Sequence, residues 1–74
     1  MKFFKMEELI PTYSVKEFAD YLADHFNAEI ADSFEKNKIS GRLFLKISEA
    51  QIEKMVEALG DVVELQSLQS RVQV

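Results

Sequence analysis

Two capping boxes fix the points at which helices begin in this chain. In each box, a serine is followed three residues later by a side chain that can accept a hydrogen bond from the serine's own backbone N–H: Ser14 with Glu17, and Ser48 with Gln51. After each serine, apolar residues recur at the spacing of one helix face. They are Val15, Phe18, Ala19, Leu22 and Phe26 after Ser14, and Ile52, Met55, Val56 and Leu59 after Ser48. The sequence therefore predicts two amphipathic helices.

Three further residues predict additional helix starts, because Asn, Ser and Asp side chains cap the first backbone N–H groups of a helix. They are Asn27, Ser40 and Asp61. The helix after Asn27 should end at Lys36, and Gly60 should interrupt the chain just before Asp61. The contiguous apolar residues 43–45 could be read as a strand. A lone strand would have no partner elsewhere in the chain, so one short buried helical turn is favoured.

These elements together predict an all-α fold, a compact five-helix bundle in residues 13–74, preceded by an N-terminal extension in residues 1–12. The predicted core consists of Phe18, Leu22, Phe34, Leu43, Leu45, Ile52, Leu59, Leu65 and Leu68. The extension is too apolar for a purely solvated tail, so we expect part of it to pack on the bundle or on a neighbouring subunit. Its apolar residues are Phe3, Phe4, Met6, Leu9 and Ile10.

The composition argues against several kinds of site. The chain has no cysteine, which excludes disulfides and thiolate metal sites and favours a reducing, intracellular compartment, cytoplasmic or nuclear. Its one histidine, His25, has no second histidine or nucleophile motif beside it, so we interpret it as a polar residue at the end of the first helix. A chain this short can hardly enclose a ligand pocket. We therefore expect no enzyme activity, cofactor, metal site or small-molecule substrate.

Hydropathy and charge narrow the partners. No apolar run approaches the ~20 residues that span a bilayer, and the N-terminal stretch has no small-residue cleavage site, so we expect neither a membrane anchor nor a signal peptide. The net charge of −4 is divided into blocks: residues 17–35 carry −6, residues 36–46 carry +4 and residues 47–64 carry −4. A nucleic-acid footprint needs a dominant basic face. Alternating blocks instead favour complementary patches that bind another protein, with no nucleic acid.

The order of these motifs resembles the sterile alpha motif (SAM) domain family over almost all of residues 13–74. The family shows an aromatic residue before Ser-Val, a Trp-Leu or similar pair in helix 1 and a Phe in helix 2. An Ile-Asp-Gly, a leucine-rich turn and a Thr that caps helix 4 follow. The matching residues are Tyr13-Ser14-Val15, Tyr21-Leu22, Phe34, Ile39-Ser40-Gly41, Leu43-Phe44-Leu45 and Ser48, with Ile52 after it.

The resemblance implies a five-helix SAM bundle and a protein–protein interaction module. Such a module self-associates head to tail or pairs with another SAM domain, as a scaffold or connector in a larger signalling protein. The alternative function within the family is RNA-hairpin binding through a basic cluster around helix 5. Residues 57–70 of this chain contain no Lys or Arg and would repel phosphate, so the alternative is disfavoured.

The resemblance also implies two contact surfaces. The mid-loop surface consists of Lys36, Lys38, Arg42 and Lys46. The end-helix surface consists of Glu57, Gly60, Asp61, Val62, Val63 and Glu64. Their charges are reversed from the acidic mid-loop and basic end helix of many relatives, but the two surfaces still complement each other.

Two details of these surfaces stay open in the sequence. Val62 or Val63 is the predicted apolar anchor, because the two side chains cannot both face the core on one helical turn. The cations could instead serve only to keep a short buried helix solvated. Likewise, Asp61 and Glu64 could serve only to cap the last helix and to complement its dipole.

Overall fold

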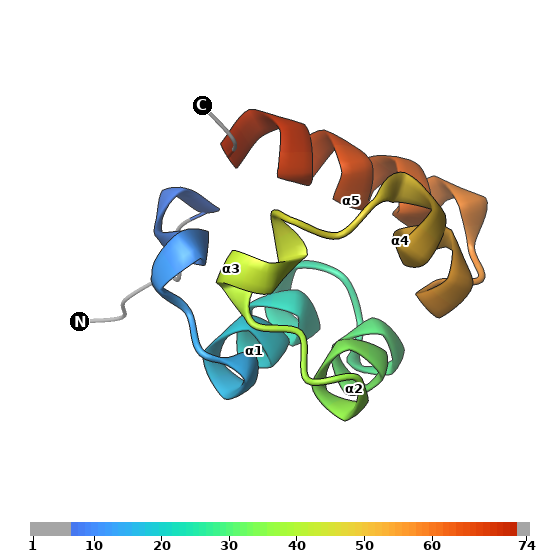
Figure 1. Cartoon of the computed structure of the whole chain (residues 1–74). Helices are drawn as coiled ribbons and strands as arrows, with labels where there is room; N and C mark the ends of the chain where they lie inside the picture. The colour runs from blue at the N-terminus through green and yellow to red at the C-terminus, as the bar shows by residue number, and fades with distance from the viewer. Residues whose placement is uncertain (1–6, 73–74) are drawn as a thin grey trace.

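The computed structural model describes residues 7–72, which form a short 3-10 helix and five α-helices and contain no strand. The elements in chain order are η1 (Glu7–Thr12), α1 (Val15–His25), α2 (Ala28–Lys36), α3 (Gly41–Phe44), α4 (Glu49–Met55) and α5 (Leu59–Val72) (Figure 1). The all-α, five-helix prediction is confirmed. Phe3, Phe4 and Met6 lie outside the described residues.

The predicted caps account for the starts of the first four α-helices. At α1, the Glu17 backbone N–H donates to the Ser14 hydroxyl at 3.2 Å, and the Ser14 N–H donates to the Glu17 carboxylate at 2.9 Å. Ser48 and Gln51 repeat this reciprocal pair at the start of α4. The side chains of Asn27 and Ser40 accept the corresponding bonds at α2 and α3. Each cap satisfies a backbone donor that the helix itself leaves without a partner.

The predicted start of α5 is wrong by three residues. The helix begins at Leu59, and the Val62 backbone N–H donates to the Ala58 carbonyl at 3.0 Å, so Asp61 lies inside the first turn and is not the cap. Gly60 does not interrupt a helix but belongs to this same turn. A glycine is tolerated there because the first backbone N–H groups of a helix have no intrahelical partner to lose. The early start brings Val62 onto the buried face of the helix.

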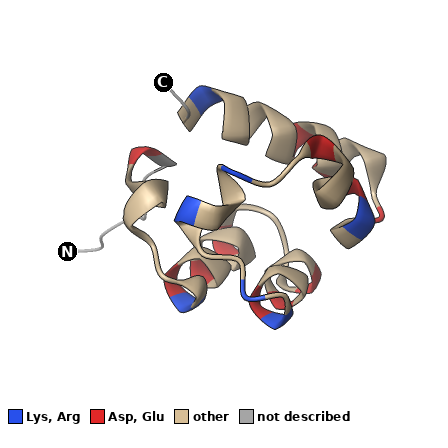
Figure 2. Ribbon diagram, in the orientation of Figure 1, with Lys and Arg blue, Asp and Glu red and all other residues tan. Residues whose placement is uncertain are grey.

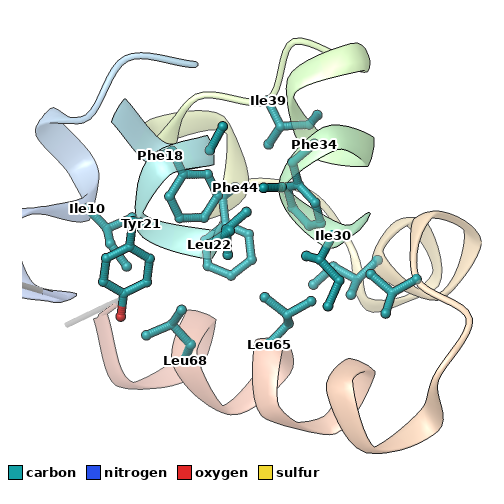
Figure 3. Packing of buried hydrophobic residues seen from close by; sticks show 14 of the residues in the cluster. Ile10, Phe18, Tyr21, Leu22, Ile30, Phe34, Ile39, Phe44, Leu65 and Leu68 are labelled. Carbon is teal, nitrogen blue, oxygen red and sulfur yellow. The ribbon is translucent and has the colours of Figure 1, made fainter. Parts of the chain in front are cut away.

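The core is built around three phenylalanines from three helices. Phe18 of α1, Phe34 of α2 and Phe44 of α3 are all fully buried. The Phe18 ring centroid lies 4.9 Å from that of Phe44 and 5.9 Å from that of Phe34, which are distances of direct aromatic contact (Figure 3). Leu65 and Leu68 of α5 cover this cluster from the other side. The core thus joins helices that are far apart in the sequence.

Most of the predicted core is confirmed, but two leucines are not part of it. Leu43 is 39% exposed and Leu59 is 74% exposed. In the single turn of α3 the inward position belongs to Phe44, so its neighbour Leu43 faces outward. Leu59 opens α5 before the buried face begins at Val62. Leu45 is half-buried against the core, and the remaining predicted residues are buried: Phe18, Leu22, Phe34, Ile52, Leu65 and Leu68.

Among the described residues of the N-terminal segment, Ile10 belongs to the core. Ile10 is fully buried, whereas Leu9 beside it is 48% exposed. The contact between η1 and α3 is so close that a Cβ on Gly41 would lie 1.8 Å from the Ile10 carbonyl oxygen. The Gly41 backbone N–H also donates to the Tyr13 carbonyl at 3.1 Å. Only glycine therefore allows η1 to close against α3.

One polar side chain connects the C-terminal helix to the middle of the fold. The side-chain amide of Gln69, on α5, donates to the carbonyls of Phe44 and Ile47, each at 2.7 Å. These two carbonyls lie where α3 ends and the connection to α4 begins, and the amide stands in for the helix bonds that they lack. Gln69 thereby fixes α5 against the segment that carries the mid-loop cations, and α5 continues to a contact with η1.

Candidate interaction surfaces

The four cations of the mid-loop surface follow the chain from the last turn of α2, through α3, to the α3–α4 connection (Figure 2). All four side chains are exposed. None of them forms an ion pair within residues 7–72, in contrast to Lys16 on α1, whose ammonium lies 3.7 Å from Asp20. Their charge is therefore not neutralised by an ion pair with any described residue and is presented to solvent.

Lys38 has an unusual backbone. Its φ is +57°, the left-handed region in which glycine is the usual residue. The Lys38 backbone N–H donates to the Glu35 carbonyl at 3.0 Å, and the next N–H, of Ile39, donates to the Phe34 carbonyl at 2.9 Å. These two bonds are the Schellman motif that ends α2. They place Ile39 in the core and leave the Lys38 side chain outside.

The mid-loop surface has an apolar residue that sequence reasoning assigned to the core. Leu43 lies next to Arg42 on α3, and its exposed fraction of 39% makes it one of the few large exposed hydrophobic residues. The signal that could have found it is the shortness of α3, because a helix of one turn has one narrow inward face, which Gly41 and Phe44 occupy. The surface therefore combines an apolar centre with surrounding positive charge.

Of the two valines predicted as the apolar anchor of the end-helix surface, only Val63 is exposed. Val62 is 4% exposed and belongs to the core, so it cannot serve as the anchor without unfolding the helix, whereas Val63 is 53% exposed. Leu59, four residues before Val63, is also exposed. Residues four apart share a helix face, so Leu59 and Val63 form one apolar ridge on the first turns of α5. Sequence reasoning missed Leu59 because it placed the start of α5 too late.

Acidic residues surround this ridge and line a neighbouring groove. Glu57 and Glu64 are exposed and Asp61 is half-buried, and Figure 2 shows acidic ribbon at the turn between α4 and α5. The groove has a volume of about 280 Å³ and lies between the first turns of α2 and the α4–α5 connection. Its lining residues are Asn27, Glu29, Ile30, Ser33, Met55, Val56, Glu57, Ala58 and Asp61. The Ser33 hydroxyl donates to the Met55 carbonyl at 3.1 Å and so ties α2 to the end of α4 beneath it.

The histidine and the acidic side chains offer little further chemistry in the described part of the chain. His25 stacks on the Tyr21 ring, with ring centroids 4.2 Å apart. Within residues 7–72, no three His, Cys, Asp or Glu side chains are grouped so that they could hold a metal ion. None of the helices in that range has the length and apolar character that crossing a membrane requires.

Comparison with known proteins identifies the fold. No protein-family model matches the chain, and no curated protein sequence matches it either. One solved structure is similar: a chain in the crystal structure of the Scm-SAM and Sfmbt-SAM heterodimer, with a TM-score of 0.71 and 20% sequence identity. The match covers 92% of this chain and 94% of the other. The chain has the SAM-domain fold.

The SAM fold does not bring the two predicted surfaces together. Helix α2 separates them: its first turns line the acidic groove, and its last turn carries Lys36. Nine residues of α-helix span about 13 Å. The two surfaces therefore belong to different parts of the SAM domain, and one copy of the chain cannot join them within itself through rigid elements.

Proposed function

We propose that this SAM domain is a protein-interaction module that binds a second SAM domain, including another copy of itself, head to tail. The mid-loop surface of one copy contacts the end-helix surface of the next. The role is one of binding rather than catalysis, as a connector within a larger protein.

The observation that carries the proposal is the matched construction of the two surfaces. Each has an exposed apolar centre, Leu43 on one and the Leu59–Val63 ridge on the other. The charged residues assigned to each surface have a single sign, positive from the end of α2 to the α3–α4 connection and negative at the start of α5. Apolar centres inside complementary charged rims are typical of specific protein interfaces, where the centre supplies most of the affinity and the rim sets orientation.

Separation of the two surfaces determines the kind of assembly. A contact between two different patches is heterologous. A complex of two copies therefore still has one free mid-loop surface at one end and one free end-helix surface at the other. Such a contact builds an open chain unless the rotation between copies closes a ring. Pairing with a different SAM domain would use one of the surfaces and stop at a heterodimer, which is the assembly found for the Scm-SAM and Sfmbt-SAM structure.

The experiment combines two single variants of the 74-residue chain. Val63→Glu places a charge on the apolar ridge, and Arg42→Glu reverses a charge on the mid-loop surface. Analytical ultracentrifugation should show that the unmutated chain assembles beyond a dimer with rising concentration, and that each variant alone does not. An equimolar mixture should form a one-to-one heterodimer, because the intact mid-loop surface of the first variant meets the intact end-helix surface of the second.

Two control variants carry the same changes in charge elsewhere. Lys16→Glu alters an exposed cation of α1, and Ala23→Glu adds a charge at an exposed small apolar position of the same helix. Both should assemble like the unmutated chain, and circular dichroism should show that all variants keep their helical content. An unmutated chain that stays monomeric at about millimolar concentration and low salt would refute self-association, since rim ion pairs worth ~0.2–1 kcal/mol are strongest under those conditions.

A further inference from the structure

We propose that Lys38 is the specificity-determining cation of the mid-loop surface: its ammonium docks in the acidic groove between α2 and the α4–α5 connection of the next copy. This inference rests on the proposed head-to-tail pairing and names the side chain that selects the partner. It also assigns a role to a residue whose backbone conformation folding alone does not favour.

The backbone at Lys38 is the first step of the argument. With φ at +57°, its Cβ crowds the following carbonyl, a contact that glycine avoids. The Schellman motif needs a left-handed residue at this place, and glycine is the residue that supplies it best. A lysine here is therefore tolerated by the turn and not required by it. Residues held in sparsely populated conformations are enriched at functional sites.

The side chain of Lys38 is the second step of the argument. It is exposed, and it forms no ion pair within residues 7–72. Lys36, in the last turn of α2, and Lys38, just past its end, both lie near the negative end of the helix dipole. The feature that distinguishes Lys38 is its left-handed backbone.

The groove supplies the complementary site. Three acidic residues line it, Glu29, Glu57 and Asp61, and the apolar residues Ile30 and Met55 line it as well. A lysine side chain matches this lining in both respects: its methylene stem packs on apolar atoms and its compact ammonium donates up to three hydrogen bonds. The chain itself contains a basic partner for this acidic groove, because residues 36–46 are its one strongly basic block. A second copy of this chain is therefore the occupant that charge complementarity selects.

The backbone and the charge of Lys38 are separated by three substitutions. Lys38→Gly should raise the Tm by roughly 2–6 °C, because it relieves the left-handed residue, and should weaken association about threefold to tenfold. Lys38→Ala keeps the unfavourable backbone, so its Tm should stay within about 2 °C while association weakens to the same extent. Lys38→Arg should restore most of the binding. Lys16→Ala removes an exposed lysine of α1 that lies outside both surfaces, and as the matched control it should change the dissociation constant less than about twofold.

A charge exchange tests the groove directly in the heterodimer of Val63→Glu with Arg42→Glu. Lys38→Glu is added to the first chain and Glu57→Lys to the second, so that both changes lie in the one intact interface. Each added change alone should weaken the heterodimer, and the two together should recover at least about threefold of the loss, which is the mark of direct coupling.

The outcomes separate this inference from the proposed function. If the parent heterodimer forms but Lys38→Ala binds as tightly as the parent, or the exchanged pair shows no recovery, the role of Lys38 is overturned and the head-to-tail pairing stands. If Lys38→Gly lowers the Tm, the argument from the backbone is overturned. If the parent heterodimer does not form at all, the proposed function fails and this inference fails with it.

Discussion

The chain has two glycines, Gly41 and Gly60, and they stand at two joints of opposite construction. At the joint between η1 and α3, a Cβ on Gly41 would lie 1.8 Å from a backbone oxygen. At the joint between α4 and α5, a Cβ on Gly60 would meet nothing within 4 Å. Neither glycine has a positive φ, so neither is required for backbone freedom. Gly41 is required for packing. Neither packing nor backbone conformation within the domain requires a glycine at position 60.

The difference indicates which contact contributes to the stability of this small domain and which region is open to a binding partner. The η1–α3 joint is closed by backbone against backbone and buries Ile10 completely. The α4–α5 joint is open, with a groove, exposed carboxylates and the exposed Leu59. Substitutions at the first joint should therefore act on folding, and substitutions at the second on association.

The largest effect is expected from Gly41→Ala. The new methyl group would overlap the Ile10 carbonyl oxygen, and because that atom is backbone, η1 and α3 must move apart. Overpacking of this kind typically costs ~1–3 kcal/mol and more where backbone blocks relaxation. In a domain whose total stability is about 5 kcal/mol, a loss of about 3 kcal/mol should be plain in urea unfolding followed by circular dichroism. An unchanged midpoint would show that the joint is looser than described.

A smaller loss is expected from Ile10→Ala at the same joint. Removing a fully buried isoleucine side chain costs ~2–5 kcal/mol, and the surface position of η1 favours the lower end because its neighbours can relax. Leu9→Ala is the matched control, since Leu9 is 48% exposed and its truncation should change the free energy of unfolding by less than about 0.5 kcal/mol. Equal losses at both positions would contradict the packing of η1 through Ile10 alone of these two residues.

The two joints also differ in how far the sequence predicts them. The helix caps are local patterns, so Ser14, Asn27, Ser40 and Ser48 are all predicted correctly. The start of α5 has no side-chain cap in the sequence: Ala58 supplies only its carbonyl, and Asp61 mimics a cap three residues too late. Because of that error, Leu59 is predicted to lie in the core, and the sequence does not decide which of Val62 and Val63 is buried.

The candidate site depends on features that a local pattern does not carry. The four mid-loop cations are visible as a charge block, and their exposure follows from their chemistry. The left-handed backbone of Lys38 is not visible, because the usual glycine is absent from the turn. The groove is not visible either, since it brings Glu29 of α2 next to Glu57 and Asp61 through the packing of α2 on α4.

The smallest expected effect, and the only gain at either joint, is that of Gly60→Ala. Alanine is favoured over glycine inside a helix by ~0.5–1 kcal/mol, because glycine loses more backbone entropy on folding. The new methyl group meets no other atom, so the free energy of unfolding should rise by about 0.5 kcal/mol, measured by urea unfolding beside Gly41→Ala. A loss instead would show that α5 does not begin at Leu59. Sedimentation of the same variant adds a second readout: if stability rises while association weakens, Gly60 is kept because a partner approaches the backbone of α5 there.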